Sequence, residues 1–460
     1  MSKNQINPTD EEPDKTVQRY EYFLSHKGEA NGYFDVEELE KIAEYYINKG
    51  RTDDCSIALD FGFTLHPNNI ALQIKRGKNL LAIGDARKAH RVLDKFSEST
   101  DFEVRMLRLE AMVHIGMKKN SLQLAWQILE SEGHTASAYI EISTFLEPLS
   151  GFELAVKILQ QGIERYPSDI EIHYELGLCF EQLGNFDDAL KIYKKITEID
   201  PFASEAWFNI GQLLYAKMEM TEALYAFNYA QALMPDDSLT SMQKAHTLFH
   251  IMRYSEALDE YKNYMELTAP GWQTHLFIAE CYERLRKIDD AMEHFNKSLD
   301  YRPDNYQSIT GLAICMLEKE QYTESLKYSR KAVIIKPDNP EAWVYLAEGF
   351  TGNEKYEDAL EAYDKAIELE PNLPDVLQSA GNVCMELQRY EQAYKYFKLA
   401  LERDTENELE DIYLLLAIAS FKCGHMTDYV LFLEKALEQN TEAGATLKEM
   451  LADDEMFNNT

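Results

Sequence analysis

Cysteine is scarce in this sequence of 460 residues, and it forms none of the short motifs that mark metal or redox sites. The six cysteines include no C-x-x-C pair, which argues against zinc-ribbon and thioredoxin-like sites. Cys179, Cys281 and Cys315 are separated by multiples of 34 residues and fit packed thiols that act as small hydrophobic side chains. This use of cysteine is typical of a reducing compartment.

Long apolar runs are also missing. The first residues, MSKNQINPTDEEPDK, contain no apolar segment of the kind found in a signal peptide. The longest strongly apolar run, YLLLAIASF at Tyr413–Phe421, is far shorter than the roughly 20 residues that a membrane-spanning helix needs. The sequence therefore predicts a cytoplasmic protein without membrane insertion.

Basic residues are also few relative to acidic ones. Lys and Arg total 46 against 80 Asp and Glu, which gives a formal net charge of −34. Such a charge disfavours binding to a phosphate backbone, so we expect no nucleic-acid partner. It favours partners with basic residues, although an acidic surface that is merely solvated is the alternative.

Catalytic and cofactor-binding motifs are absent as well. The glycines form no phosphate-binding loop, and no G-x-S-x-G or Cys/His arrangement occurs. His246 and His250 have the spacing of two metal ligands, but the only third ligand nearby, His275, occupies a position expected to pack. We therefore expect no metal, no cofactor and no enzymatic activity, with both histidines serving as polar surface residues.

What the sequence does contain is a unit that recurs every 34 residues, best seen at 340–371. Apolar residues with helical spacing in its two halves predict two short helices, and Pro371 ends the second helix. The first helix has Trp343, Leu346, Ala347 and Phe350 on one face, and the second has Ala359, Tyr363 and Ala366. A helix pair this small cannot bury both apolar faces alone, so it requires neighbours of the same kind.

Stepping along the chain by 34 residues finds those neighbours. A small residue near the start of the second helix recurs as Ala155, Ala189, Ala223, Ala257, Ala291, Ser325, Ala359 and Ala393. A small residue inside the first helix recurs as Ser143, Gly177, Gly211, Ala245, Ala279, Ala313, Ala347 and Gly381. An aromatic follows as Tyr193, Phe227, Tyr261, Phe295, Tyr363 and Phe397, with Leu159 and Ser329 as exceptions, and prolines close the units at 167, 201, 235, 303, 337 and 371.

This combination of period, small residues, aromatic and proline resembles the tetratricopeptide repeat (TPR) family over about residues 36–440. The resemblance implies an all-α fold, a right-handed superhelical solenoid of about twelve helix–turn–helix repeats with a C-terminal capping helix. It implies nothing about which partner is bound.

The repeats divide the chain into five parts. Residues 1–16 are predicted to be a disordered acidic tail, 17–35 an N-terminal cap segment, and 36–133 three repeats, of which the third is degenerate. Residues 136–405 form eight repeats in strict phase, and 408–460 the last repeat plus the capping helix. The degenerate repeat is interpreted either as a packing adjustment or as a hinge.

In the family, first helices line the concave surface, which usually holds the partner. By this resemblance we expect a partner-binding groove made of Tyr174, Leu178, Phe208, Asn209, Gln212, Tyr215, Met242, Gln243, His246, Phe249, His250, Leu276, Glu280, Ile314, Leu317, Glu348 and Asn382. Aromatics and methionine flanked by carboxylates suit an amphipathic protein segment with basic residues. The alternative is that some of these side chains pack on a neighbouring helix. The Lys/Asn/Arg clamp with which some relatives hold chaperone tails is absent from the in-phase repeats.

A basic patch in the second repeat contrasts with the acidic chain. It contains Lys75, Lys78, Arg87, Lys88 and Arg91. Such a patch could dock an acidic partner or the acidic end of another copy, or be a solvated face. The sequence thus predicts a non-catalytic scaffold or adaptor that binds another protein. The alternatives are a self-assembling homo-oligomer, joined through its acidic and basic surfaces, and a regulatory module of a separate enzyme.

Overall fold

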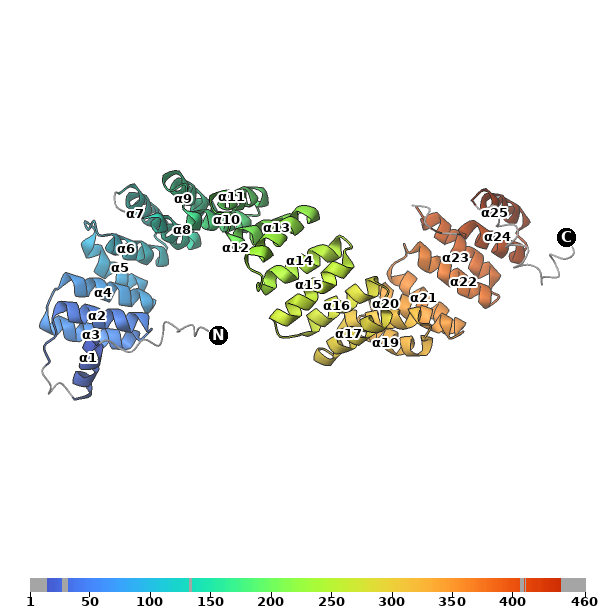
Figure 1. Cartoon of the computed structure of the whole chain (residues 1–460), viewed down its shortest axis with the longest axis horizontal. Coiled ribbons are helices and arrows are strands. Elements are labelled where there is room, and N and C mark those ends of the chain that lie inside the picture. The colour runs from blue at the N-terminus through green and yellow to red at the C-terminus, as the bar shows by residue number, and fades with distance from the viewer. Residues whose placement is uncertain (1–14, 27–31, 132–134, 406–408, 410, 440–460) are drawn as a thin grey trace. The chain divides into compact units, whose positions relative to one another are not determined.

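A computed structural model describes residues 15–26, 32–131, 135–405, 409 and 411–439. These residues form 25 α-helices and no strand, which confirms the all-α prediction. The chain splits into two compact units, Met1–Met218 and Glu219–Thr460. Figure 1 shows that, within each unit, helix pairs follow one another in chain order.

The first unit contains twelve α-helices and a short 3-10 turn, Asp94–Phe96, within its described residues. The helices are α1 (Lys15–Ser25), α2 (Val36–Asn48), α3 (Thr52–Leu65), α4 (Ile70–Ala82), α5 (Ala86–Leu93), α6 (Phe102–His114), α7 (Lys118–Glu130), α8 (Ala136–Ser150), α9 (Phe152–Arg165), α10 (Ile170–Gln182), α11 (Phe186–Ile199) and α12 (Ser204–Ala216).

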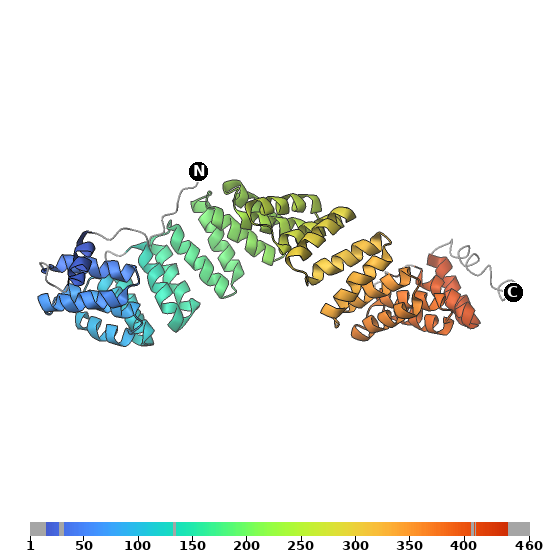
Figure 2. The same ribbon diagram turned by 90° about the horizontal axis from the view of Figure 1, so that it is seen from below.

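The second unit contains thirteen α-helices in its described part. They are α13 (Met220–Leu233), α14 (Ser238–His250), α15 (Tyr254–Leu267), α16 (Trp272–Arg284), α17 (Ile288–Tyr301), α18 (Tyr306–Glu318), α19 (Tyr322–Ile335), α20 (Pro340–Gly352), α21 (Tyr356–Leu369), α22 (Pro374–Glu386), α23 (Tyr390–Arg403), α24 (Ile412–Cys423) and α25 (Met426–Gln439). Figure 2 shows the same succession of pairs from a second direction.

Local sequence sets where these helices begin and end. Many first helices start after an Asp or Asn whose side chain accepts a hydrogen bond from the backbone, as Asp169 does from Ile172 N and Asn305 from Ser308 N. Each second helix that precedes one of the six spaced prolines ends two residues before it. The sequence therefore determines both ends of the unit.

The small and aromatic positions form the core of each pair. Every small residue of the two repeating positions is buried, as are the six aromatics and the exceptions Leu159 and Ser329. Small residues let the backbones of two helices approach, and the rings fill the remaining space between helices. This packing confirms the predicted helix-pair repeat and explains the period.

The turn inside each pair has a feature that the sequence did not reveal. One residue of the turn has positive φ, and it is glycine in some repeats, such as Gly184 at 72°. In six consecutive repeats it is another residue: Met218, Met252, Arg286, Glu320, Glu354 and Gln388, with φ between 56° and 63°. The backbone following it bonds back to the first helix, as Asn185 N does to Phe180 O at 2.8 Å.

The ends of the chain limit what can be compared with the predicted boundaries. Helix α1 begins at Lys15, and its buried Val17 and Tyr20 pack with Phe34 and Leu39. Most of the predicted tail, residues 1–14, and the predicted capping helix, residues 442–460, lie outside the described residues. Among the described helices, none is long and apolar enough to cross a membrane.

Candidate functional site

The predicted groove residues lie on the first helices of the pairs, and we call the face that they form the first-helix surface. Residues Tyr174 to Tyr215 of the set belong to α10 and α12 in the first unit. Residues Met242 to Asn382 belong to α14, α16, α18, α20 and α22 in the second unit. The two parts are therefore described separately.

In the first unit, this surface is only partly apolar and open. Leu178 is 45% exposed and Gln212 is exposed, whereas Phe208, Asn209 and Tyr215 are half-buried. Tyr174 is half-buried against the ring of Tyr193, with a centroid distance of 6.3 Å, and burial raises the pKa of Tyr174 to about 12. This part offers exposed apolar area, with Leu178 as its most open apolar side chain among the predicted residues.

In the second unit, α14 contributes an immobilised histidine. The Nδ1 atom of His246 lies 2.6 Å from the Tyr261 hydroxyl, and its ring meets Phe277 edge-on at 4.7 Å. Burial, together with His250, lowers the pKa of His246, so its ring is a neutral hydrogen-bonding group at neutral pH. Its neighbours Met242, Gln243 and Phe249 are half-buried, and His250 is exposed.

Of the remaining predicted residues, Leu276 does not lie where the sequence predicts it. Leu276 is only 4% exposed and packs in the core with Ala291 and Phe295, so the expectation that it lines the surface is wrong. Its position in the helix pattern matched the surface, but its side chain fills space between two pairs. Ile314 and Leu317 are half-buried, and Glu348 and Asn382 are exposed.

Three of the predicted residues come together around one hollow of about 280 Å³. Phe249, Glu280 and Ile314 line it, from α14, α16 and α18. The other lining residues are Glu283, Arg284, Phe295, Gln307, Thr310 and Gly311. We call this feature the Phe249 hollow.

Glycine at position 311 accounts for the depth of the hollow. A Cβ atom there would lie 2.3 Å from Cζ of the Phe295 ring, so only glycine accommodates this ring. In the next repeat the sizes are exchanged, because Tyr345 and Ser329 occupy the positions equivalent to Gly311 and Phe295. The exchange places a large side chain where the preceding repeat has the hollow.

Carboxylates without cationic partners surround this part of the surface. Glu280, Glu283 and Glu348 form no ion pair among the described residues, although the charge of Arg284 acts on the first two and that of Arg286 on Glu283. Burial raises the pKa of Glu280 to about 7, and Glu283 adds to the shift. Burial also raises the pKa of Glu283 and that of Glu348, although Glu348 is exposed to water. A side chain that water reaches but that protein atoms crowd is typical of a recessed surface.

Tyr345 is a surface residue that the sequence analysis missed. It is half-buried, and burial with the nearby Glu341 and Glu348 raises its pKa to about 12. The charge of Glu283, on α16, also raises the pKa of Tyr345. Tyr345 does not belong to the predicted set, and its equivalent in the preceding repeat is Gly311.

A second hollow, of about 580 Å³, lies between α20 and α21. Trp343 and Phe350 line it together with Asp358, Glu361 and Glu368, and Lys365 pairs with Glu368 at 2.6 Å. It contains none of the predicted groove residues and draws on the two helices of a single pair. We therefore centre the candidate site on the Phe249 hollow, where several pairs and the unpaired carboxylates converge.

The predicted basic patch is not one surface. Lys75 and Lys78 lie on the first helix α4, and both bind Glu44 at 2.7 Å. Arg87, Lys88 and Arg91 lie on α5, exposed to solvent, with Lys88 bound to Asp85 at 2.6 Å. Glu103 lies within 3.8 Å of both lysines as well, so the two cations of α4 are paired with two carboxylates within the protein, and α5 carries the remaining basic face.

Comparisons with known proteins agree with this architecture. Family models described as tetratricopeptide repeat match residues 149–204, 197–238, 273–305, 340–373 and 374–407. No curated protein matches the sequence.

Three solved structures of similar proteins show how low the sequence identity and the TM-score are. YrrB, a TPR protein with an unusual peptide-binding site, is 17% identical, with a TM-score of 0.36 over 41% of this chain and 96% of that chain. The APC/C hetero-tetramer Cut9–Hcn1 is 14% identical, with a TM-score of 0.43 over 88% of this chain and 98% of that chain. A tetratricopeptide repeat protein from Parabacteroides merdae is 17% identical, with a TM-score of 0.43 over 54% and 98%. At this distance they carry no information on partners.

Proposed function

Because the chain belongs to the tetratricopeptide repeat family, we propose that it is a non-catalytic scaffold that binds a segment of another protein. The segment lies on the first-helix surface of the second unit, and it is amphipathic with Lys or Arg residues. The observation that carries this proposal is the pair of carboxylates without ion pairs, Glu280 and Glu283, that line the Phe249 hollow, with Glu348 on the first-helix surface of α20.

The carboxylates supply the electrostatic part of binding. A carboxylate that protein atoms crowd and no cation pairs with is destabilised in its charged form. A Lys or Arg from a partner would stabilise that form and lower the pKa of Glu280 towards its ordinary value. Charged partners of opposite sign also increase the rate of association and select against acidic segments.

The Phe249 hollow supplies the apolar part. Its volume of about 280 Å³ is enough for one large aliphatic or aromatic side chain, and Phe249, Phe295 and Ile314 give it apolar walls. Burying such a side chain contributes on the order of 2 kcal/mol. A bound segment would therefore place one apolar residue in the hollow and basic residues within a few positions of it.

Selection from a displayed library of random peptides tests this proposal without knowledge of the natural partner. The intact chain should enrich peptides in which Lys or Arg flanks Leu, Ile, Phe or Trp. Replacing Glu280, Glu283 and Glu348 by Gln should abolish the preference for basic residues, and Phe249→Ala should weaken the preference for the apolar anchor.

Glu266→Gln is the matched control, because Glu266 is an exposed carboxylate on the second helix α15. It should select the same peptides as the wild type. Enrichment of acidic peptides, or a basic preference that survives the triple Gln substitution, would rule out this surface.

We also place the scaffold in the cytoplasm. All six cysteines are free thiols, and Cys55, Cys179, Cys281, Cys315 and Cys384 are buried without forming disulfides. Burial in a reduced state is usual for proteins of a reducing compartment.

A further inference from the structure

Similar ion pairs form at three of the boundaries between successive repeats. The carboxylate belongs to the first turn of the second helix of one repeat. The cation belongs to the turn that joins the two helices of the next repeat. The three pairs are Lys217–Asp187 at 2.8 Å, Lys319–Asp289, and Arg389–Glu357 at 3.7 Å. The turn of one repeat is thus linked electrostatically to the second helix of the repeat before it.

The last junction has different chemistry at the same place. Glu391 occupies the position in α23 that Glu357 occupies in α21, 34 residues earlier. Opposite Glu391, the residue before α25 is His425 rather than a permanent cation, and Cys423 ends α24 two residues before it. Gly424 between them has a φ of 79°, which brings the Cys and His side chains to the same side of the turn.

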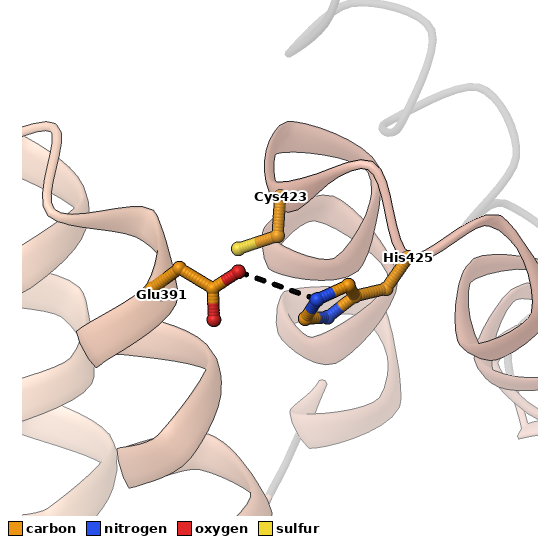
Figure 3. Close-up of side chains that lie close together, drawn as sticks. All are labelled: Glu391, Cys423 and His425. Carbon is orange, nitrogen blue, oxygen red and sulfur yellow. Dashed lines mark ion pairs between the residues drawn. The ribbon is translucent and has the colours of Figure 1, made fainter.

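Figure 3 shows Cys423 and His425 facing the carboxylate of Glu391 from the neighbouring helix. His425 Nε2 lies 3.2 Å from Glu391 Oε1, and one ligand atom of each of the three residues lies within 4.8 Å of the other two. In a tetrahedral zinc site, bonds of about 2.0–2.3 Å place neighbouring ligand atoms roughly 3–4 Å apart. Small side-chain rotations therefore bring all three atoms to bonding distance.

We propose that Glu391, Cys423 and His425 bind a divalent transition-metal ion of the zinc class. Thiolate, imidazole and carboxylate are all ligands of Zn²⁺, whereas the thiolate and imidazole disfavour Mg²⁺ and Ca²⁺. Coordination displaces the thiol proton of Cys423 to solvent and leaves a fourth position on the ion for water. The ion replaces the cation of the earlier junctions and links α23 to the turn between α24 and α25.

Cys423 differs from the other cysteines in the way this role requires. It is the one cysteine of the six that is partly exposed, since the other five are buried.

Two further side chains, Tyr394 and Asp428, lie next to the cluster. The Tyr394 ring lies edge-on to His425 at 5.1 Å, and Tyr394 donates a hydrogen bond to Asp428 at 2.5 Å. The hydrogen bond to Asp428 holds the Tyr394 ring that lies against His425.

Metal titration of the intact, reduced chain tests the proposal with Zn²⁺ and Co²⁺ as probes. We expect one tightly bound ion per chain, a thiolate-to-cobalt charge-transfer band, and a higher Tm with Zn²⁺ that a chelator reverses. Cys423→Ser and His425→Gln should each weaken Zn²⁺ binding at least about 100-fold, and Cys423→Ser should remove the charge-transfer band. Glu391→Gln changes an exposed side chain and should weaken binding without disturbing the fold.

His114→Gln is the matched control, because His114 lies 3.8 Å from Glu110 but belongs to no three-ligand cluster among the described residues. This variant should bind Zn²⁺ as the wild type does. The proposal is overturned if no stoichiometric ion binds, which would leave His425 as a hydrogen-bonding partner of Glu391. It is equally overturned if binding survives both Cys423→Ser and His425→Gln.

Discussion

Glu280 is destabilised in the unbound protein, and this cost depends on pH. Its pKa is raised from 4.5 to about 7 by burial and by the charge of Glu283. The folded protein therefore holds this proton more tightly than the unfolded chain. The stability that results is fully present below about pH 4.5 and is lost as the pH rises through about 7.

Replacing Glu280 by Gln should remove that loss. At pH 8 we expect Glu280→Gln to stabilise the second unit by about 1–2 kcal/mol after solvent screening, or about 2–6 °C in Tm. At pH 4 the same substitution should change Tm little, because the carboxyl is then neutral. Thermal unfolding followed by circular dichroism at both pH values measures the difference, with Glu266→Gln as the control. A destabilisation at pH 8 would mean that the Glu280 carboxylate already has a stabilising partner.

Binding of a basic peptide should depend on pH in the opposite direction. Since the peptide prefers the ionised carboxylate, affinity should fall as the pH drops from 8 to 6, by up to about tenfold per unit below pH 7. Titration of a library-selected peptide across this range measures the slope. In Glu280→Gln the slope should be much smaller. An affinity that is constant with pH in the wild type would argue against Glu280 as a contact.

For single residues, the sequence predicts which helix face a side chain occupies better than it predicts whether that side chain is buried. The predicted groove set includes Phe249, Glu280 and Ile314, which line one hollow. It wrongly includes Leu276 and omits Tyr345, because helix spacing gives the direction of a side chain but not the size of the residue opposite it. The depth of the hollow depends on the Gly311–Phe295 contact, which joins two different repeats and has no signature within either one.

Helices and turns differ in how far the sequence determines them. Helix bounds follow from the prolines, the Asp and Asn caps and the apolar spacing, so the pairs could be predicted throughout the in-phase repeats. The left-handed residue of the turns could not, because Met252, Arg286 and Glu320 carry no turn signal. The surrounding hydrogen bonds impose this conformation on residues that do not favour it.

The turns offer a direct test of that strain. Glu320→Gly should stabilise the second unit by about 0.5–1 kcal/mol, because glycine adopts a φ of 57° without steric cost. The reverse change, Gly184→Ala, introduces the same strain and should destabilise the first unit by about 1 kcal/mol. Urea unfolding of both variants beside the wild type provides the comparison. Opposite signs would show that chain entropy in the unfolded state outweighs the turn conformation.

For the whole molecule, charge argues against self-assembly. The net charge of −34 repels other copies, and two of the five basic residues predicted to mediate contact, Lys75 and Lys78, are paired with Glu44 and Glu103 within the protein. The face of α5, with Arg87, Lys88 and Arg91, is what remains of the predicted basic patch.

We therefore expect sedimentation to give a monomer mass at both 0.05 M and 0.5 M salt. Screening is strong at the higher concentration, where the Debye length is only about 4 Å, so an oligomer joined by charges would dissociate there. Arg87→Glu combined with Arg91→Glu should leave the mass unchanged. An oligomer at low salt that both high salt and this double substitution dissociate would support the self-assembling scaffold instead.

The most direct measurement for the account is a calorimetric titration of one library-selected basic peptide into four proteins. These are the wild type, the Gln variant of Glu280, Glu283 and Glu348, Phe249→Ala, and Glu266→Gln. We expect stoichiometric binding to the wild type and to Glu266→Gln. For the triple Gln variant and for Phe249→Ala, the affinity should be at least about tenfold lower. Equal affinity for all four proteins would contradict this account, because the peptide would then bind a surface other than the Phe249 hollow and its carboxylates.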